Sequence, residues 1–266
     1  MSTEKKTKEI EKTDIYQEDL KYLETAVKTA WSRYSGQGKT EKKGVKDLVT
    51  DADFAIENYL IGAIRERYPE DSFLTEETNT NERLSGRTWT IDPIDGTINF
   101  AYGIPLYGTQ ISLFDGADLA LAMIYLPAFS EMYTAVKGDG AYLNGERIYA
   151  APRPFIESIA ASGGFSMSPE LLAQQKKLIA VLPEKIMRMR MFGAACAGFA
   201  FAAAGRIQCF ITATKNKWDI CPGILLAREA GCVVSGVDER CDVEGDFIIV
   251  GANEKTCDTV CGLLTE

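Results

Sequence analysis

A stretch of twelve residues, Trp89 to Phe100, constrains this chain more than any other part of its sequence. A β-rich run leads into two aspartates, Asp92 and Asp95, on either side of Pro93. Proline fixes φ and has no N–H, so we expect it to end the strand and to hold the two carboxylates in a tight bend. Carboxylates arranged in this way suit a divalent metal ion.

The residues behind this bend predict an anion site. Gly96 permits close approach of the backbone, and Thr97 and Asn99 provide a hydroxyl and an amide where a helix could begin. The exposed N–H groups at a helix start favour phosphate. Local turn chemistry alone would account for the same residues, so the assignment depends on the rest of the chain.

The absence of histidine narrows the possible chemistry. Histidine is the usual general base, and it is also the usual ligand of zinc and non-haem iron. Any metal must then be held mainly by oxygen atoms, which indicates magnesium, manganese or calcium. The formal charge of −9 argues against a nucleic-acid polymer or an anionic membrane as the partner, although an acidic protein can still bind phosphate locally.

The seven cysteines are odd in number and include no C-x-x-C pair, so we expect reduced thiols rather than disulfides or a zinc ribbon. No apolar run approaches the roughly 20 residues that span a bilayer, and the charged N-terminus lacks the apolar segment of a signal peptide. These features predict a cytoplasmic protein. The 266 residues, 46% of them hydrophobic, can fill a sizeable core.

The pattern along the chain predicts a tail and two sub-domains. Residues 1–14 are rich in Lys, Glu and Thr and lack periodicity, so we expect a mobile tail. Residues 15–150 predict an α+β sub-domain that begins with a helix to Tyr34 and carries most of the metal ligands. A proline-bearing segment at Ala151–Pro154 precedes a second, α/β sub-domain over residues 151–266, which carries Asp219 and the substrate-side residues.

Four acidic residues share a position at a strand end or a helix start: Glu76, Asp92, Asp95 and Asp219. In layered α/β folds such ends gather in one cleft. Each close pair of carboxylates would cost about 4 kcal/mol at about 4 Å with an effective dielectric near 20, so two divalent cations are the natural neutraliser. The cleft could then accept a phosphate. Asp53 also begins a helix, where an acidic residue is favoured in any case.

Four motifs, in order, resemble the inositol monophosphatase family of magnesium-dependent, lithium-sensitive phosphatases. They are the signature Asp-Pro-Ile-Asp-Gly-Thr-x-Asn-Phe at 92–100, Trp218-Asp219 before a helix, Asp47-Leu48-Val49-Thr50-x-x-Asp53, and an acidic pair after a strand. The resemblance covers the chain from about Tyr16 to Leu263. It implies a layered αβαβα sandwich, in the α/β (α+β) class, of the inositol monophosphatase and fructose-1,6-bisphosphatase type, and it suggests a homodimer.

The resemblance also implies a set of metal ligands. A first magnesium would be held by Glu76, Asp92 and the backbone carbonyl of Ile94, and a second by Asp92, Asp95 and Asp219. The family implies two or three Mg²⁺ ions per subunit, with Mn²⁺ as a possible substitute.

The family's mechanism implies water as the nucleophile. Thr97 and Asp53 would orient the water, Glu76 would hold the metal that activates it, and the amides of Gly96 and Thr97 would hold the phosphate. The reaction would be an in-line displacement without a covalent enzyme intermediate.

Departures from the family's pattern concern mainly the substrate. Thr212 stands where the animal enzymes have a glutamate that contacts inositol, and the turn before Ala195 lacks the usual threonine. Thr75 replaces the usual glycine before the acidic pair. Lys215 or Lys217 could favour a second anionic group. The predicted substrate is therefore a small phosphorylated metabolite, namely inositol monophosphate or a related sugar, polyol or nucleotide phosphate.

Two other functions remain open at this stage. A phosphatase of the haloacid-dehalogenase type also uses Asp and Asp-Gly-Thr, but it needs Asp-x-Asp and this chain has Asp-x-x-Asp. A catalytically silent protein on the same fold could bind metal and act in regulation or interaction, since folds outlive their activities.

Overall fold

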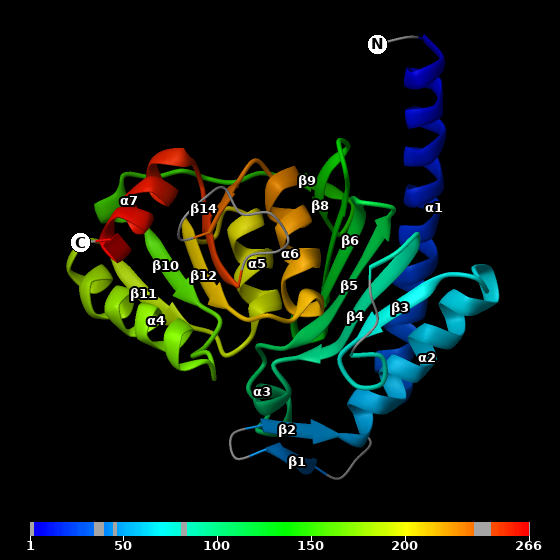
Figure 1. Cartoon of the computed structure of the whole chain (residues 1–266), viewed down its shortest axis with the longest axis horizontal. Coiled ribbons are helices and arrows are strands. Elements are labelled where there is room, and N and C mark those ends of the chain that lie inside the picture. The colour runs from blue at the N-terminus through cyan, green and yellow to red at the C-terminus, as the bar shows by residue number, and fades with distance from the viewer. Residues whose placement is uncertain (1–2, 35–39, 45–46, 81–83, 237–245, 266) are drawn as a thin grey trace.

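The computed structural model describes residues 3–34, 40–44, 47–80, 84–236 and 246–265. Helices and sheets alternate in five layers (Figure 1): α1 and α2, a seven-stranded sheet, α5 and α6, a five-stranded sheet, and α4 and α7. The predicted layered αβαβα sandwich is confirmed. None of the helices in the described ranges is long and apolar enough to cross a membrane.

Seven α-helices are described, and six of them build the helical layers. The helices are α1 (Thr3–Tyr34), α2 (Asp51–Arg67), α3 (Thr97–Ala101), α4 (Pro169–Val181), α5 (Ala195–Ala203), α6 (Lys217–Glu229) and α7 (Glu254–Thr265). The short α3 lies instead at the end of the larger sheet, directly after the acidic stretch (Figure 1).

The larger sheet follows chain order, which is the simplest way to join strands through hairpins. Its strands are β3 (Ser72–Thr75), β4 (Arg87–Asp95), β5 (Gly108–Asp115), β6 (Asp118–Leu126), β7 (Glu131–Val136), β8 (Gly140–Leu143) and β9 (Glu146–Ile148). Only the first pair, β3 and β4, is parallel. The other pairs are antiparallel, and the turns Asp115-Gly116 and Asn144-Gly145 join two of them.

The smaller sheet has the strand order β11-β10-β12-β14-β13. Its strands are β10 (Ile159–Ser162), β11 (Arg188–Met191), β12 (Cys209–Ala213), β13 (Val233–Ser235) and β14 (Phe247–Gly251). β10 lies parallel to both β11 and β12, so their carboxyl ends meet at one edge. A separate hairpin joins β1 (Thr40–Gly44) to β2 (Asp47–Thr50). In the chain, the segment 151–154 follows β9 of the larger sheet and precedes β10 of the smaller sheet.

Apolar side chains form three clusters between the layers. One joins α1 and α2 to the larger sheet around Trp89, and a second joins α4 and α7 to the smaller sheet around Leu178. The third surrounds α5 and α6 and takes residues from both sheets, among them Tyr133 and Phe210. The two predicted sub-domains therefore share one continuous core through α5 and α6.

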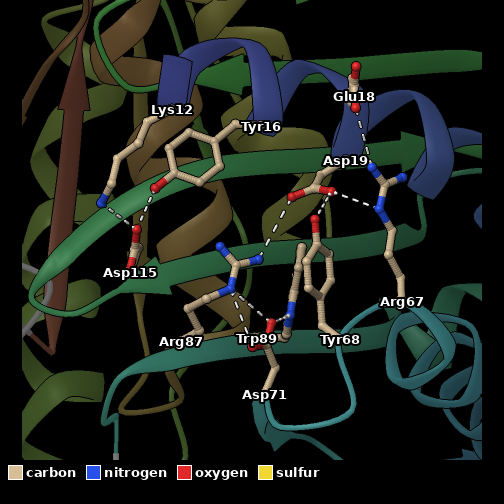
Figure 2. Close-up of polar contacts among 10 residues, drawn as sticks. All are labelled: Lys12, Tyr16, Glu18, Asp19, Arg67, Tyr68, Asp71, Arg87, Trp89 and Asp115. Atoms are coloured by element: carbon tan, nitrogen blue, oxygen red, sulfur yellow. Dashed lines mark hydrogen bonds and ion pairs between the residues drawn. The ribbon is translucent and has the colours of Figure 1, made fainter. Parts of the chain in front are cut away.

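Helix α1 begins at Thr3 rather than at Ile15, so residues 3–14 of the segment predicted as a mobile tail are helical. Figure 2 shows how this helix docks on the sheet. Asp19 is 1% exposed, accepts a 2.6 Å hydrogen bond from the Tyr68 hydroxyl and lies 3.4 Å from Arg67 and 3.8 Å from Arg87. Further toward the N-terminus, Lys12 pairs with Asp115 at 2.8 Å.

Candidate active site

Strand β4 carries Asp92 and Asp95, and its pairing with β5 is irregular between them. Asp92 lies opposite Gln110 and Asp95 opposite Gly108, so β4 has one residue more than β5 in this interval. Residues three apart on a regular strand face opposite sides, and the additional residue returns Asp95 to the side of Asp92. The sequence predicts that Pro93 ends the strand, but β4 continues through it to Asp95. The irregular pairing at this point tolerates a residue without an N–H.

Gly96 turns the chain from β4 into α3. Its φ of +84° lies in the left-handed region, and a Cβ there would be 2.9 Å from both the Ala194 Cβ and the Leu106 carbonyl oxygen. The close backbone approach predicted for Gly96 is therefore real. Asn99 donates 2.7 Å hydrogen bonds to the carbonyls of Leu106 and Phe192, so its amide joins loops instead of facing the bend.

Asp53 and Thr97 come together across the start of α2. One oxygen of Asp53 accepts hydrogen bonds from the Thr50 N–H at 2.8 Å and the Thr50 hydroxyl at 2.5 Å, which caps the helix. The other oxygen lies 3.2 Å from the Thr97 hydroxyl, which is also 3.0 Å from the Ile94 carbonyl. Asp53 therefore both caps α2 and contacts the predicted catalytic threonine. The side chain of Asp47, in the same motif, lies outside the described residues.

Glu76 follows β3 and reaches the site through the parallel pairing of β3 with β4. Its N–H donates to the Ile91 carbonyl at 3.2 Å, directly before Asp92. The loop after it is held from α2: the buried Glu57 carboxylate accepts hydrogen bonds from the hydroxyls of Thr75 and Thr78 at 2.9 and 2.5 Å. Thr75, which replaces the family's usual glycine, therefore makes a specific contact in this loop.

Asp219 lies in the first turn of α6, two residues after the helix begins at Lys217. One of its carboxylate oxygens accepts a 2.9 Å hydrogen bond from the Thr214 hydroxyl and a 3.3 Å bond from the Asn216 amide. The Gln110 amide donates to its backbone carbonyl at 3.0 Å, and Gln110 faces Asp92 in the sheet. These contacts connect α6 to β4.

Asp95 is held by the start of α5. The Cys196 N–H donates to its carboxylate, and the N–H groups of Ala195 and Gly96 contribute as well. Burial raises the pKa of Asp95, and these N–H groups partly offset that rise. The Cys196 thiol is itself buried beside Asp95, which raises its pKa well above the usual range, so it stays protonated near neutral pH.

Asp92 is at the centre of the acidic group and is 2% exposed. Burial raises its pKa well above the usual carboxyl range, and the charges of Glu76, Asp95 and Asp219 raise it further. Its Oδ1 is buried without a hydrogen-bond partner. A buried carboxylate oxygen without a donor, next to three more acidic residues, fits a divalent cation.

The acidic residues do not form a closed cage by themselves. Within the described ranges, no three Asp, Glu or Cys side chains are arranged so that they could already hold a metal ion. The contacts of Asp95 with the start of α5 and of Asp219 with Thr214 explain this arrangement, since each carboxylate has N–H or O–H donors of its own. The donor set fits a metal by its chemistry, and to close around an ion these carboxylates would have to exchange their N–H and O–H donors for it.

The predicted substrate-side residues lie on α5, on β12 and at the start of α6. Ala195 is buried in the first turn of α5, next to the N–H that contacts Asp95. Thr212 is buried on β12, two residues before Thr214. Lys217 is partly buried at the start of α6. Lys215 lies 3.6 Å from Asp246 and is mostly exposed.

Sequence reasoning missed several residues that hold the acidic side chains. Glu57 carried a signal: it is an acidic residue four positions after Asp53, at the spacing of the buried face of α2. Thr214 and Asn216 lie just before a helix, where such residues are expected as caps, and nothing in the sequence indicated that they bond Asp219. The contact of the Cys196 N–H with Asp95 joins residues far apart in the chain and left no sequence signal.

Comparison with known proteins gives a consistent result. A sequence model of the inositol monophosphatase family matches residues 11–265. The chain is 32% identical over 205 residues to the fructose-1,6-bisphosphatase/inositol-1-monophosphatase of Thermotoga maritima, covering 77% of each chain. It is 34% identical over 202 residues to the Nus factor SuhB of Haemophilus influenzae, covering 75% of this chain and 76% of that one.

Solved structures share the fold. The Thermotoga maritima IMPase superposes with a TM-score of 0.84 at 28% identity, covering 95% of this chain and 97% of the other. An IMPase/NADP phosphatase solved with Mg²⁺ and phosphate gives a TM-score of 0.81 over 95% of each chain, and at 21% identity this likeness concerns the fold alone.

Proposed function

Because the chain belongs to the inositol monophosphatase family, we propose that it is a magnesium-dependent phosphomonoesterase acting on a small phosphorylated metabolite. The observation that carries the proposal is the buried Asp92 with its unpartnered oxygen among Glu76, Asp95 and Asp219. Such a group is stable in its charged form only with a compensating cation.

The donor set supports the proposed ligands. Glu76, Asp92 and the Ile94 carbonyl form one set, and Asp92, Asp95 and Asp219 form the other. When bound, divalent cations would lower the pKa of water and neutralise charge on the phosphate and the leaving oxygen. Mn²⁺ is the expected substitute for Mg²⁺, since both take oxygen ligands.

Thr97 and Asp53 would position the attacking water. The Asp53 carboxylate accepts a hydrogen bond from the Thr97 hydroxyl. The lone pairs of that hydroxyl oxygen can then accept a hydrogen bond from the water. The water attacks phosphorus, the bond from phosphorus to the leaving alcohol oxygen breaks, and no residue of the chain becomes phosphorylated.

The N–H groups of Gly96 and Thr97 are the proposed phosphate donors. The Gly96 N–H lowers the pKa of Asp95, so Asp95 and a phosphate would compete for this donor. The left-handed backbone at Gly96 leaves space for a phosphate oxygen, because a side chain at this position is excluded.

Phosphate release in the presence of magnesium tests the proposal. We expect activity that is lost with a chelator, is restored by Mg²⁺ and falls at least about a thousandfold in Asp92→Asn. Asp118→Asn, an exposed aspartate at the far end of the larger sheet, is the matched control and should keep full activity. Full turnover by Asp92→Asn at saturating Mg²⁺ would refute the two-metal mechanism, and a trapped phospho-aspartate would support the haloacid-dehalogenase alternative.

The substrate is proposed only as a class. Thr212 brings a neutral hydroxyl where an acidic residue contacts inositol in animal enzymes, while Lys217 adds positive charge close to Asp219. Initial rates with inositol phosphate, fructose bisphosphate, histidinol phosphate and adenosine bisphosphate would rank the candidates. Faster turnover of the bisphosphates, reduced in Lys217→Met, would support a second anionic group at this lysine.

A second function is favoured by a specific observation, the similarity to proteins named Nus factor SuhB. A relative that is named as a Nus factor and not as a phosphatase is compatible with the alternative of a catalytically silent, metal-binding interaction protein on this fold. Metal binding without hydrolysis across the four substrates would favour that alternative.

Three further properties are proposed from the family and the sequence. We expect a cytoplasmic location, in line with the six described cysteines, all of which are free thiols. We expect a homodimer, which light scattering would show as twice the 29.2 kDa chain mass. Lithium should inhibit phosphate release at saturating Mg²⁺, which initial rates would measure.

A further inference from the structure

Glu57 is a buried carboxylate whose three hydrogen bonds all go to one loop. It is 0% exposed on the inner face of α2, among apolar residues of that helix. Its Oε1 accepts from the hydroxyls of Thr75 and Thr78 at 2.9 and 2.5 Å, and its Oε2 accepts from the Glu77 N–H at 2.8 Å. Burying a carboxylate costs several kcal/mol, so the contacts must be well formed to retain it.

The donors that reach Glu57 come from both sides of Glu76. Thr75 precedes this residue and Glu77 follows it, so the backbone of Glu76 is held at both of its neighbours. Asn79 closes the loop by donating its N–H and its side-chain amide to the Thr75 hydroxyl at 3.2 and 3.3 Å. These contacts restrain the backbone on both sides of Glu76.

Helix α2 therefore supports two parts of the site through one face. Asp53 contacts Thr97, and Glu57, one helical turn later, holds the loop of Glu76. We propose that Glu57 is a positioning residue, which holds Glu76 at the place where it can share a divalent cation with Asp92. This inference rests on the proposed function, in which Glu76 and Asp92 are metal ligands.

Two substitutions test the role of these hydrogen bonds. In Glu57→Gln the amide group donates where a carboxylate oxygen accepted, so either the Glu77 N–H or the threonine hydroxyls lose their acceptor. Thr78→Val removes one donor at an exposed position and is the safeguard if Glu57→Gln does not fold. Thr80→Val, an exposed threonine of the same segment, is the matched control.

The measurement is Mn²⁺ binding to the full chain, followed by electron paramagnetic resonance of the free ion, with no turnover involved. We expect the dissociation constant to rise about 10-fold or more in Glu57→Gln, as for other residues that orient a metal ligand, and about 3-fold in Thr78→Val. At saturating metal, kcat should change less than the metal affinity does. Thr80→Val should bind as the wild type.

The outcomes separate this inference from the proposed function. Urea unfolding measures the stability of each variant independently of its metal affinity. A purely structural role of Glu57 would shift the unfolding midpoint and leave the Mn²⁺ dissociation constant unchanged. If the wild type binds Mn²⁺ and hydrolyses phosphate while the folded variants bind within twofold of it, the role of Glu57 is refuted and the proposed function stands. If the wild type binds no Mn²⁺, both are refuted.

Discussion

Asp92 is the residue at which stability and the proposed metal binding oppose one another. A carboxyl group with a raised pKa stabilises the fold while it is protonated, and this contribution is lost as the pH rises through that pKa. Without metal, Asp92→Asn should therefore be more stable than the wild type above the usual carboxyl range of about pH 4, by about 1–3 kcal/mol. Urea unfolding between acidic and neutral pH in a chelating buffer would measure this.

The same titration predicts how metal binding depends on pH. Protons and cations compete for Asp92, so Mg²⁺ affinity should increase as the pH rises through the raised pKa of this residue. Calorimetry in buffers of different ionisation enthalpy should show protons released on binding. Metal binding that releases no protons would contradict the raised pKa of Asp92.

Gly96 allows a prediction with an internal control. An alanine there would have to adopt a φ of +84° and would place its Cβ 2.9 Å from Ala194 and Leu106. Gly103→Ala has a similar φ of +70° with nothing within 4 Å, so it carries only the backbone cost, about 1–2 kcal/mol. Gly96→Ala should cost roughly 1–3 kcal/mol more because of crowding. Equal unfolding midpoints would contradict this.

At the scale of elements, the sequence predicted which segments are helices and strands better than it predicted where they begin and end. The helix containing Asp219 and the strand leading to Asp92 were both recognisable, because turn residues and apolar spacing are local signals. The start of α1 was missed, since residues 3–14 carry no apolar stripe. The irregular pairing of β4 was missed because it depends on β5, which lies elsewhere in the chain.

Docking of α1 depends on the buried Asp19, whose partners come from α2 and β4 (Figure 2). Asp19→Ala should destabilise the fold by about 3 kcal/mol, because Arg87 and Tyr68 would lose a buried partner. Asp118→Ala breaks the exposed pair with Lys137 and should cost about 0.5 kcal/mol or less. Thermal unfolding of both variants gives the comparison. Equal decreases in Tm would show that the buried contacts of Asp19 stabilise the fold no more than the exposed pair does.

At the scale of the whole molecule, the proposed cations join its parts. Their proposed ligands come from the residue after β3, from β4 and from α6, which belong to both predicted sub-domains. Mg²⁺ at about 100 times its dissociation constant should stabilise the fold by about 2.7 kcal/mol, or raise Tm by roughly 5–10 °C. Calorimetric scans with and without Mg²⁺ test this, and Asp92→Asn should lose most of the shift. An unchanged wild-type Tm would contradict binding to the folded state.

The acidic residues of the candidate site could be proposed from the sequence because each lies in a local motif, whereas the hydrogen bonds of Glu57 and of the Cys196 N–H join distant segments. Their roles required the folded chain. The three apolar clusters show the same distinction, because apolar spacing identifies the buried faces of the elements and leaves their partners undetermined.

The additional residue in β4 opposite β5 means that the direction of the Asp95 side chain depends on how many residues each strand has in this interval. Inserting one residue into β5 between Gly108 and Thr109 would restore regular pairing with the aspartates still three positions apart, and would turn Asp95 to the opposite face, although both aspartates would still be present in the sequence. Replacing Ile94 by valine would keep the spacing and the backbone carbonyl. A library of single-residue insertions and substitutions should therefore find Ile94 tolerant of apolar exchange, and β5 intolerant of an added residue between Gly108 and Thr109.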